Sequence, residues 1–159
     1  RSCSAAVNIP DYGVLVIGGL GKNRLILRST ELLTRRSGVV GGGGGEKWQW
    51  LPYIPMNKEH GVDPLAVYFQ GRVYVVGRGE KVNEMEMLDM AASGQWTSLT
   101  SFGPGQYFSI YHMAIVGNDL FVNVNDMLYS IELDGDLKRQ LTKWRKRKSA
   151  FYGDFMTVH

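Results

Sequence analysis

Short apolar runs separated by turn residues recur along the chain, and many of them come in pairs. Each pair consists of two runs rich in β-branched, aromatic or aliphatic residues around a turn that contains glycine or asparagine. Such residues favour strands, and glycine or asparagine tolerates the positive φ that tight hairpin turns need. The sequence therefore predicts three β-hairpins, with strands at 5–7 and 14–17, at 65–69 and 73–76, and at 112–116 and 120–122.

Each hairpin is followed by a third short run and then by a fourth run that contains tryptophan. The third runs lie at 30–33, 84–88 and 127–133, and the last two alternate polar and apolar residues as half-exposed strands do. Trp48 and Trp96 open two of the fourth runs, with a weaker copy at 141–144. The tryptophans are 48 residues apart, within the roughly 40 to 50 residues of a propeller blade. The pattern predicts an all-β chain of three four-stranded units, at about 4–52, 65–100 and 112–144.

This order of strands, a glycine-containing bend, glycines after the second strand and a Trp-x-x-Leu run resembles the Kelch motif. Gly18-Gly19 matches the paired glycine of that family, whereas the second copy has residues 77–79 and the third 123–125 at this place. Tyr74 and Tyr129 lie near positions where the family often has aromatic residues. The resemblance covers about 5–144, and it is degenerate in the third copy. It implies that residues 1–159 form a single Kelch-repeat region, a β-propeller fragment of about three four-stranded blades.

The chain departs from the motif in two segments. Residues 35–45 insert a stretch that ends in five consecutive glycines, and we expect a flexible loop there because glycine loses the most backbone entropy on ordering. Residues 149–158 could form the first strand of another blade. Three blades fall short of the four to eight of a closed propeller, so we expect further blades in the parent chain or self-association of copies.

Charge and cysteine content narrow the classes of partner and compartment. The net charge is +3, and five of the 18 basic residues lie in one run at 143–148, so the remainder is near neutral. Nucleic acid and membrane are therefore not favoured as partners. The run itself could be a nuclear-import or phosphate-binding patch, or a solvated loop between blades in which Trp144 packs. One cysteine, Cys3, cannot form an internal disulfide, which favours an intracellular, cytoplasmic location.

One nucleotide-binding interpretation competes for the first copy. Residues 14–22 combine a strand, a glycine loop and Lys22, and residues 25–33 could be drawn as a helix. A P-loop requires Ser or Thr after the lysine, but Asn23 follows, and the dinucleotide fingerprint would place its third glycine at Arg24. A sharp turn at a strand end accounts better for Gly18 and Gly19.

Other chemistry has little support in the sequence. The candidate metal ligands His60, His112, His159 and Cys3 lack ligand spacing, and no Gly-x-Ser-x-Gly motif occurs. Glu84 and Glu86 share one side of a strand, and we interpret them as part of a solvated strand face. We predict no catalytic residues, metal or cofactor.

The remaining class of function is binding through loops. Recognition residues often lie in loops, here the connections between second and third strands and those between blades. Arginine and tyrosine often anchor interfaces. The candidates are Arg24, Arg28, Arg78 and Lys81 in the first kind of loop, and Tyr107 and Tyr111 in the second. We therefore predict a non-enzymatic protein–protein interaction module, whose partner could be an acidic segment.

The Kelch resemblance further implies roles such as the substrate-recruiting part of a ubiquitin-ligase adaptor or an actin-associated protein. The alternative is a propeller enzyme acting on a sugar or other small molecule. That alternative requires titratable residues around a central channel, whereas the strands expected nearest the channel, at 14–17, 73–76 and 120–122, are apolar.

Overall fold

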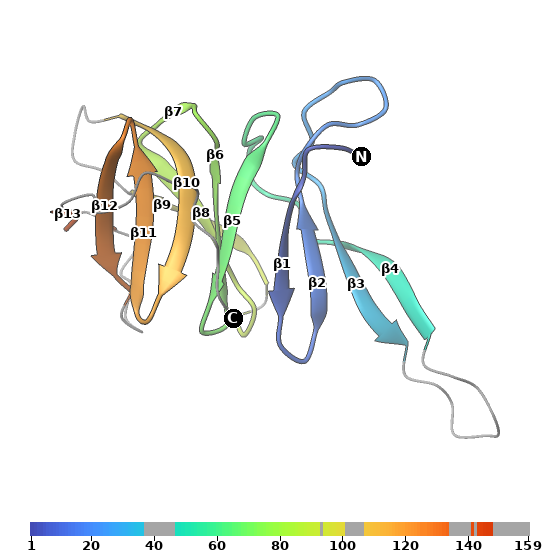
Figure 1. Cartoon of the computed structure of the whole chain (residues 1–159). Coiled ribbons are helices and arrows are strands. Elements are labelled where there is room, and N and C mark those ends of the chain that lie inside the picture. Colours follow the sequence, from blue (N-terminus) through green and yellow to red (C-terminus); the bar gives the residue numbers. More distant parts are fainter. Residues whose placement is uncertain (37–46, 93, 101–106, 134–140, 142, 148–159) are drawn as a thin grey trace.

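The computed structural model describes residues 1–36, 47–92, 94–100, 107–133, 141 and 143–147. Within these residues, thirteen strands form three antiparallel sheets, and there is no helix. The sheets stand side by side, each of them open (Figure 1). The all-β prediction is confirmed. No helix that could span a membrane occurs in the described part of the chain.

The first two sheets have four strands each, and the third has five. The first sheet contains β1 (Ala5–Ile9), β2 (Gly13–Ile17), β3 (Thr30–Arg36) and β4 (Lys47–Tyr53) in that order. The second contains β5 (Pro64–Phe69), β6 (Arg72–Gly77), β8 (Glu84–Asp89) and β9 (Trp96–Thr100). The third contains β13 (Arg145–Arg147), β12 (Met127–Glu132), β11 (Asp119–Val124), β10 (Phe108–Val116) and the two-residue β7 (Lys81–Val82).

The three predicted hairpins are confirmed as β1–β2, β5–β6 and β10–β11, each antiparallel. Two details differ from the prediction. β3 continues to Arg36 because it pairs with β4 along its whole length, down to Lys47. The last strand of the third sheet is Arg145–Arg147 rather than residues 141–144. Residues 37–45 of the predicted loop and the tail at 149–158 lie outside the described residues.

The pairing register defines which residues are equivalent in the three sheets, and it corrects the sequence alignment. A row of paired residues crosses the first sheet through Val14, Leu33 and Trp50. The equivalent row of the second sheet passes through Val73, Leu88 and Trp96. Trp96 therefore corresponds to Trp50, whereas the 48-residue spacing had suggested Trp48.

The second sheet is buried on both faces, because the first and third sheets pack against its opposite sides. Successive side chains of a strand point to opposite sides, so alternate residues of β6 contact different sheets. Val73 and Val75 of β6 cluster with Leu15 and Ile17 of the first sheet. Tyr74 and Val76, the alternate residues of the same strand, cluster with residues of the third sheet such as Leu120. This arrangement explains why β6 is a continuous apolar run.

The strands that lie next to one another between sheets are the first strands of the three hairpins. β5 contacts both β1 and β10 (Figure 1). The sequence had suggested the second strands, β2, β6 and β11, for this inner position. Those strands are more apolar because each is central in its sheet, with a paired strand on both sides.

Candidate interaction surface

The β2–β3 loop carries two of the predicted binding residues. Gly18 and Gly19 begin it with φ values of +59° and +86°, and the Leu27 N–H donates to the Gly19 carbonyl. A Cβ on Gly19 would lie 2.4 Å from the Ser2 carbonyl oxygen, so only glycine fits this turn. Arg24 and Arg28 are exposed on the loop, and Arg28 donates to the Asn57 carbonyl oxygen across 3.3 Å.

Four other predicted residues gather where the second sheet meets β10. Arg78 lies in the turn after β6 and forms an exposed ion pair with Asp63 at 2.8 Å. The ring of Tyr111 lies against Gly79, whose added Cβ would be 3.3 Å from the ring. The Gly79 N–H donates to the Ile110 carbonyl, which fixes this turn against β10.

Lys81 and Tyr111 were predicted in loops, and this prediction is wrong. Lys81 begins β7 and pairs with Ser109 of β10. Tyr111 lies inside β10 at a register shift between Ile110 and His112, where the irregular pairing turns its side chain outward. Tyr107, just before β10, is exposed as expected.

The structure thus brings Arg78, Lys81, Tyr107 and Tyr111 to one place, which we call the β7–β10 surface. Arg24 and Arg28 lie on the β2–β3 loop of the first sheet, and no hydrogen bond or ion pair joins them to that surface among the described residues. Both groups lie at strand ends of the same side, because the β2–β3 and β6–β8 connections are equivalent in the two sheets.

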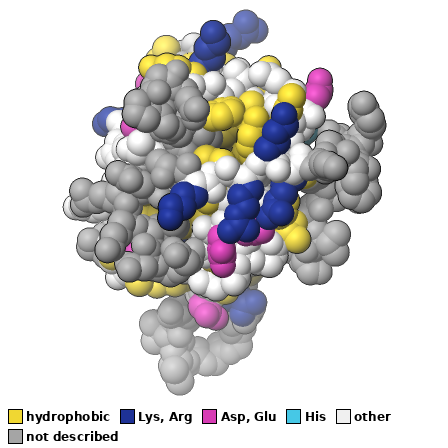
Figure 2. Space-filling model, turned by 90° about the vertical axis from the view of Figure 1, so that its left-hand side faces the viewer, with side chains coloured by type: hydrophobic (Ala, Val, Ile, Leu, Met, Phe, Trp, Pro, Cys, Tyr) yellow, Lys and Arg dark blue, Asp and Glu magenta, His cyan; other side chains and the backbone are white. Residues whose placement is uncertain are grey.

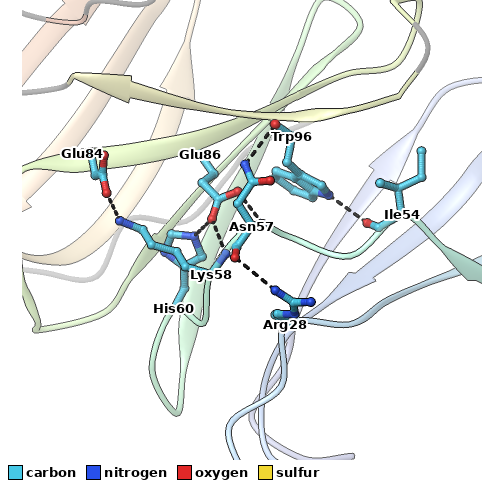
Figure 3. Close-up of polar contacts among 8 residues, drawn as sticks. All are labelled: Arg28, Ile54, Asn57, Lys58, His60, Glu84, Glu86 and Trp96. Atoms are coloured by element: carbon cyan, nitrogen blue, oxygen red, sulfur yellow. Dashed lines mark hydrogen bonds and ion pairs between the residues drawn. The ribbon is translucent and has the colours of Figure 1, made fainter.

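A buried polar network ties the β4–β5 linker to the second sheet (Figure 3). Glu86 of β8 has no exposed surface, and its two carboxylate oxygens accept the backbone N–H groups of Asn57 and Lys58 at 2.8 and 3.0 Å. His60, also buried, lies with its Nε2 3.0 Å from the same carboxylate and donates to it while Glu86 is ionised.

Two further contacts extend the network. The Asn57 side chain donates to the Trp96 carbonyl, and the Trp96 indole N–H donates to the Ile54 carbonyl at 2.8 Å. Lys58 pairs with Glu84 on the same strand face as Glu86. The linker between the first two sheets is therefore held along its length by polar contacts to the second sheet.

The electrostatics of Glu86 favour its ionised form. Burial by itself raises the pKa of a carboxyl group, but the hydrogen bonds from His60, Asn57 and Lys58 outweigh it, so the pKa of Glu86 lies below its ordinary value. The interpretation of Glu86 as part of a solvated strand face is wrong for this reason. Glu84 is partly exposed, and the prediction that both carboxylates share one side is confirmed.

Three other hypotheses from the sequence concern nucleotide binding, metal binding and the basic run. Residues 30–36 form β3, so the helix required by the nucleotide-binding interpretation is absent. Among the described residues, no three His, Cys, Asp or Glu side chains lie close enough to hold a metal ion. In the basic run, Trp144 packs against the core of the third sheet, and residues 145–147 form a strand rather than a loop.

A pocket of about 530 Å³ lies beside the β1–β2 turn, at the end of the first sheet opposite the β2–β3 loop. Tyr12, Trp48 and Arg35 line it, and the Arg35 guanidinium lies 5.2 Å from the centre of the Trp48 ring. None of the three was predicted as a binding residue, because they come from a turn and two strands that are separate in the sequence.

No protein-family model matches the chain, and no curated protein matches it in sequence. The Kelch resemblance therefore depends on the repeat pattern alone.

Proposed function

We propose that this chain is a Kelch-type β-propeller segment that acts as a non-enzymatic protein interaction module. The observation that carries the proposal is the repeated build of the three sheets: the same row of second, third and fourth strand residues recurs in register, and the sheets pack face against face. Repeated sheets with their connections gathered at strand ends leave those connections free to bind.

The binding surface in this proposal is the β7–β10 surface. Tyr107 is 59% exposed and Tyr111 40% exposed, and large aromatic rings are among the residues that most often anchor interfaces. Lys81 and Arg78 add positive charge beside the rings, although Asp63 already pairs with Arg78. An extended protein segment with acidic and apolar side chains fits this combination.

A ubiquitin-ligase adaptor that recruits substrates and an actin-associated protein are the two specific roles that we propose within this class. Both would use an exposed rim to hold another protein. They differ in the partner, so one binding experiment with two kinds of probe separates them.

The experiment measures fluorescence anisotropy of a labelled acidic peptide and of a matched peptide in which Gln and Asn replace Glu and Asp. We expect the acidic peptide to bind more tightly, and to lose affinity as salt screens the charges. The variants Lys81→Ser and Tyr111→Ser should weaken binding about tenfold, which corresponds to ~1.4 kcal/mol. Co-sedimentation with filamentous actin tests the actin role directly.

Arg36→Ser and Tyr12→Ser are the matched controls, because both residues are exposed at the opposite end of the first sheet. Equal binding of the two peptides would contradict an acidic partner. Unchanged binding by the Lys81 and Tyr111 variants would contradict the location of the surface.

A further inference from the structure

The second and third sheets each pack one face against the sheet that precedes it in the chain, and we call this the leading face. The leading face of the first sheet is the face that carries the equivalent residues. In the second sheet, Val73 and Leu88 of this face have no exposed surface, and Trp96 is only 5% exposed. They cluster with Leu15 and Ile17 of the first sheet. The paired residues Val73, Leu88 and Trp96 thus form the row on which the preceding sheet packs.

The third sheet has an equivalent row on its leading face. Leu120 is fully buried and pairs with Ile131, and Trp144 stands one residue before Arg145, which pairs with Ser130. All three belong to the cluster that this sheet forms with the second sheet. The equivalent rows of the second and third sheets therefore both pack against the preceding sheet.

In the first sheet the equivalent row is open. Trp50 is 55% exposed, and Val14 and Leu33 are half-buried, although their counterparts in the second sheet are buried. The neighbouring row of the first sheet, Ala6, Val16 and Glu31, is equivalent to Ala66, Val75 and Glu86 of the second. This row is also more exposed in the first sheet, since Glu86 has no exposed surface. The Glu31 side chain is 46% exposed and pairs with Arg1 at 3.2 Å.

On the far side of the third sheet, Figure 2 shows hydrophobic side chains together with both basic and acidic side chains. Phe121 and Leu128 of this face are half-buried, and Arg145 and Arg147 of β13 point the same way, as their pairing with Ser130 and Leu128 requires. The Arg145 side chain is 61% exposed. Arg145 pairs with Glu132 and Arg147 with Asp119, so the face offers apolar side chains beside two ion pairs.

We propose that the leading face of the first sheet binds the far face of the third sheet of a second copy of this chain, head to tail. The contact repeats the sheet-on-sheet packing that the chain already makes twice. The charged groups of both faces are already paired within the chain, Glu31 with Arg1, Arg145 with Glu132 and Arg147 with Asp119, so neither face brings an unpaired charge to the contact. The contact is heterologous, so each copy uses two different surfaces. It is separate from the β7–β10 surface and does not depend on the proposed function.

The test uses two variants of the whole chain, each with one face blocked. Trp50→Glu blocks the first sheet on its exposed edge strand, and Leu128→Glu blocks the third sheet beside Arg147. Light scattering should give an oligomer for the unmodified chain and a monomer for each variant alone. An equimolar mixture of the two variants should form a dimer, because each supplies the face that the other lacks.

Leu25→Glu is the matched control, since Leu25 is 65% exposed on the β2–β3 loop, away from both faces, and it should associate like the unmodified chain. Circular dichroism verifies that each variant is folded. If Trp50→Glu does not fold, Val16→Lys tests the same face. A monomer for the unmodified chain, or a mixture that stays monomeric, would overturn the proposal. Dimers of Leu128→Glu alone would instead mean that two leading faces meet, which also overturns it.

Discussion

Replacing Glu86 by glutamine keeps the size of the side chain but removes the charge that holds the β4–β5 linker to the second sheet. The glutamine oxygen can still accept one N–H group. Its NH₂ group, however, would face a donor, either the backbone N–H of Asn57 or that of Lys58 together with His60 Nε2. A buried donor without an acceptor costs about 1–3 kcal/mol, and hydrogen bonds to a charged group are about twice as strong as neutral ones. We expect the free energy of unfolding to fall by about 2–4 kcal/mol.

Urea unfolding followed by circular dichroism at neutral pH measures this loss. Glu84→Gln is the matched control, because Glu84 lies two residues away on the same face but pairs with Lys58 where both side chains are about 40% exposed. Such an exposed pair contributes about 1 kcal/mol or less. Equal losses for the two variants would refute the conclusion that the buried carboxylate secures the linker.

The same carboxylate predicts a pH dependence of stability. Because the folded protein lowers the pKa of Glu86, the unfolded chain takes up this proton first as the pH falls. The stabilisation is therefore complete above the ordinary pKa of 4.5 and is lost as the pH falls through the lower pKa of the folded state. The difference in unfolding free energy between the unmodified chain and Glu86→Gln should shrink below that pH. A difference that stays constant into strong acid would contradict the assigned ionisation.

Three further predictions concern the packing, and urea unfolding measures each of them. Trp96→Phe removes the indole N–H that donates to the Ile54 carbonyl and should cost about 1–3 kcal/mol, whereas Trp50→Phe in the exposed equivalent position should cost less than about 0.5 kcal/mol. Gly19→Ala should destabilise more than Gly71→Ala, because both have positive φ but only the Gly19 Cβ would meet backbone, at the Ser2 carbonyl. Leu15→Ala should cost about 2–5 kcal/mol, as the side chain is fully buried between the first two sheets.

The strands and hairpins were predictable because their signals are local. Apolar runs around Tyr12-Gly13, Gln70-Gly71 and Gly117-Asn118 fix each hairpin within a few residues. The fourth strand was less certain, because Trp48 and Trp50 are both aromatic and two residues apart, so either could align with Trp96. Only the pairing of Leu33 with Trp50 and of Leu88 with Trp96 decides between them.

The polar network was not predictable, because its partners are distant in sequence. The donors to Glu86 are mainly backbone N–H groups of residues 57 and 58, and a backbone group leaves no sign in the sequence. The β7–β10 surface was only partly predictable for a related reason. Lys81 and Tyr111 have the expected residue types, but the short pairing of Lys81 with Ser109 gives no periodic signal.

Glu31 and Glu86 show how far a repeat in sequence determines an environment. Both pair with a valine of the second strand in their sheets, Val16 and Val75, so the register assigns them the same position. Glu86 is nevertheless buried and bonded by a linker that belongs to the preceding sheet, whereas Glu31 is half-exposed and held by Arg1 alone among the described side chains. The difference arises from what packs on the face and not from the residue. If another sheet packs on the first sheet, the exposed fraction of Glu31 should therefore fall, whereas Glu86 is already fully buried and should not change.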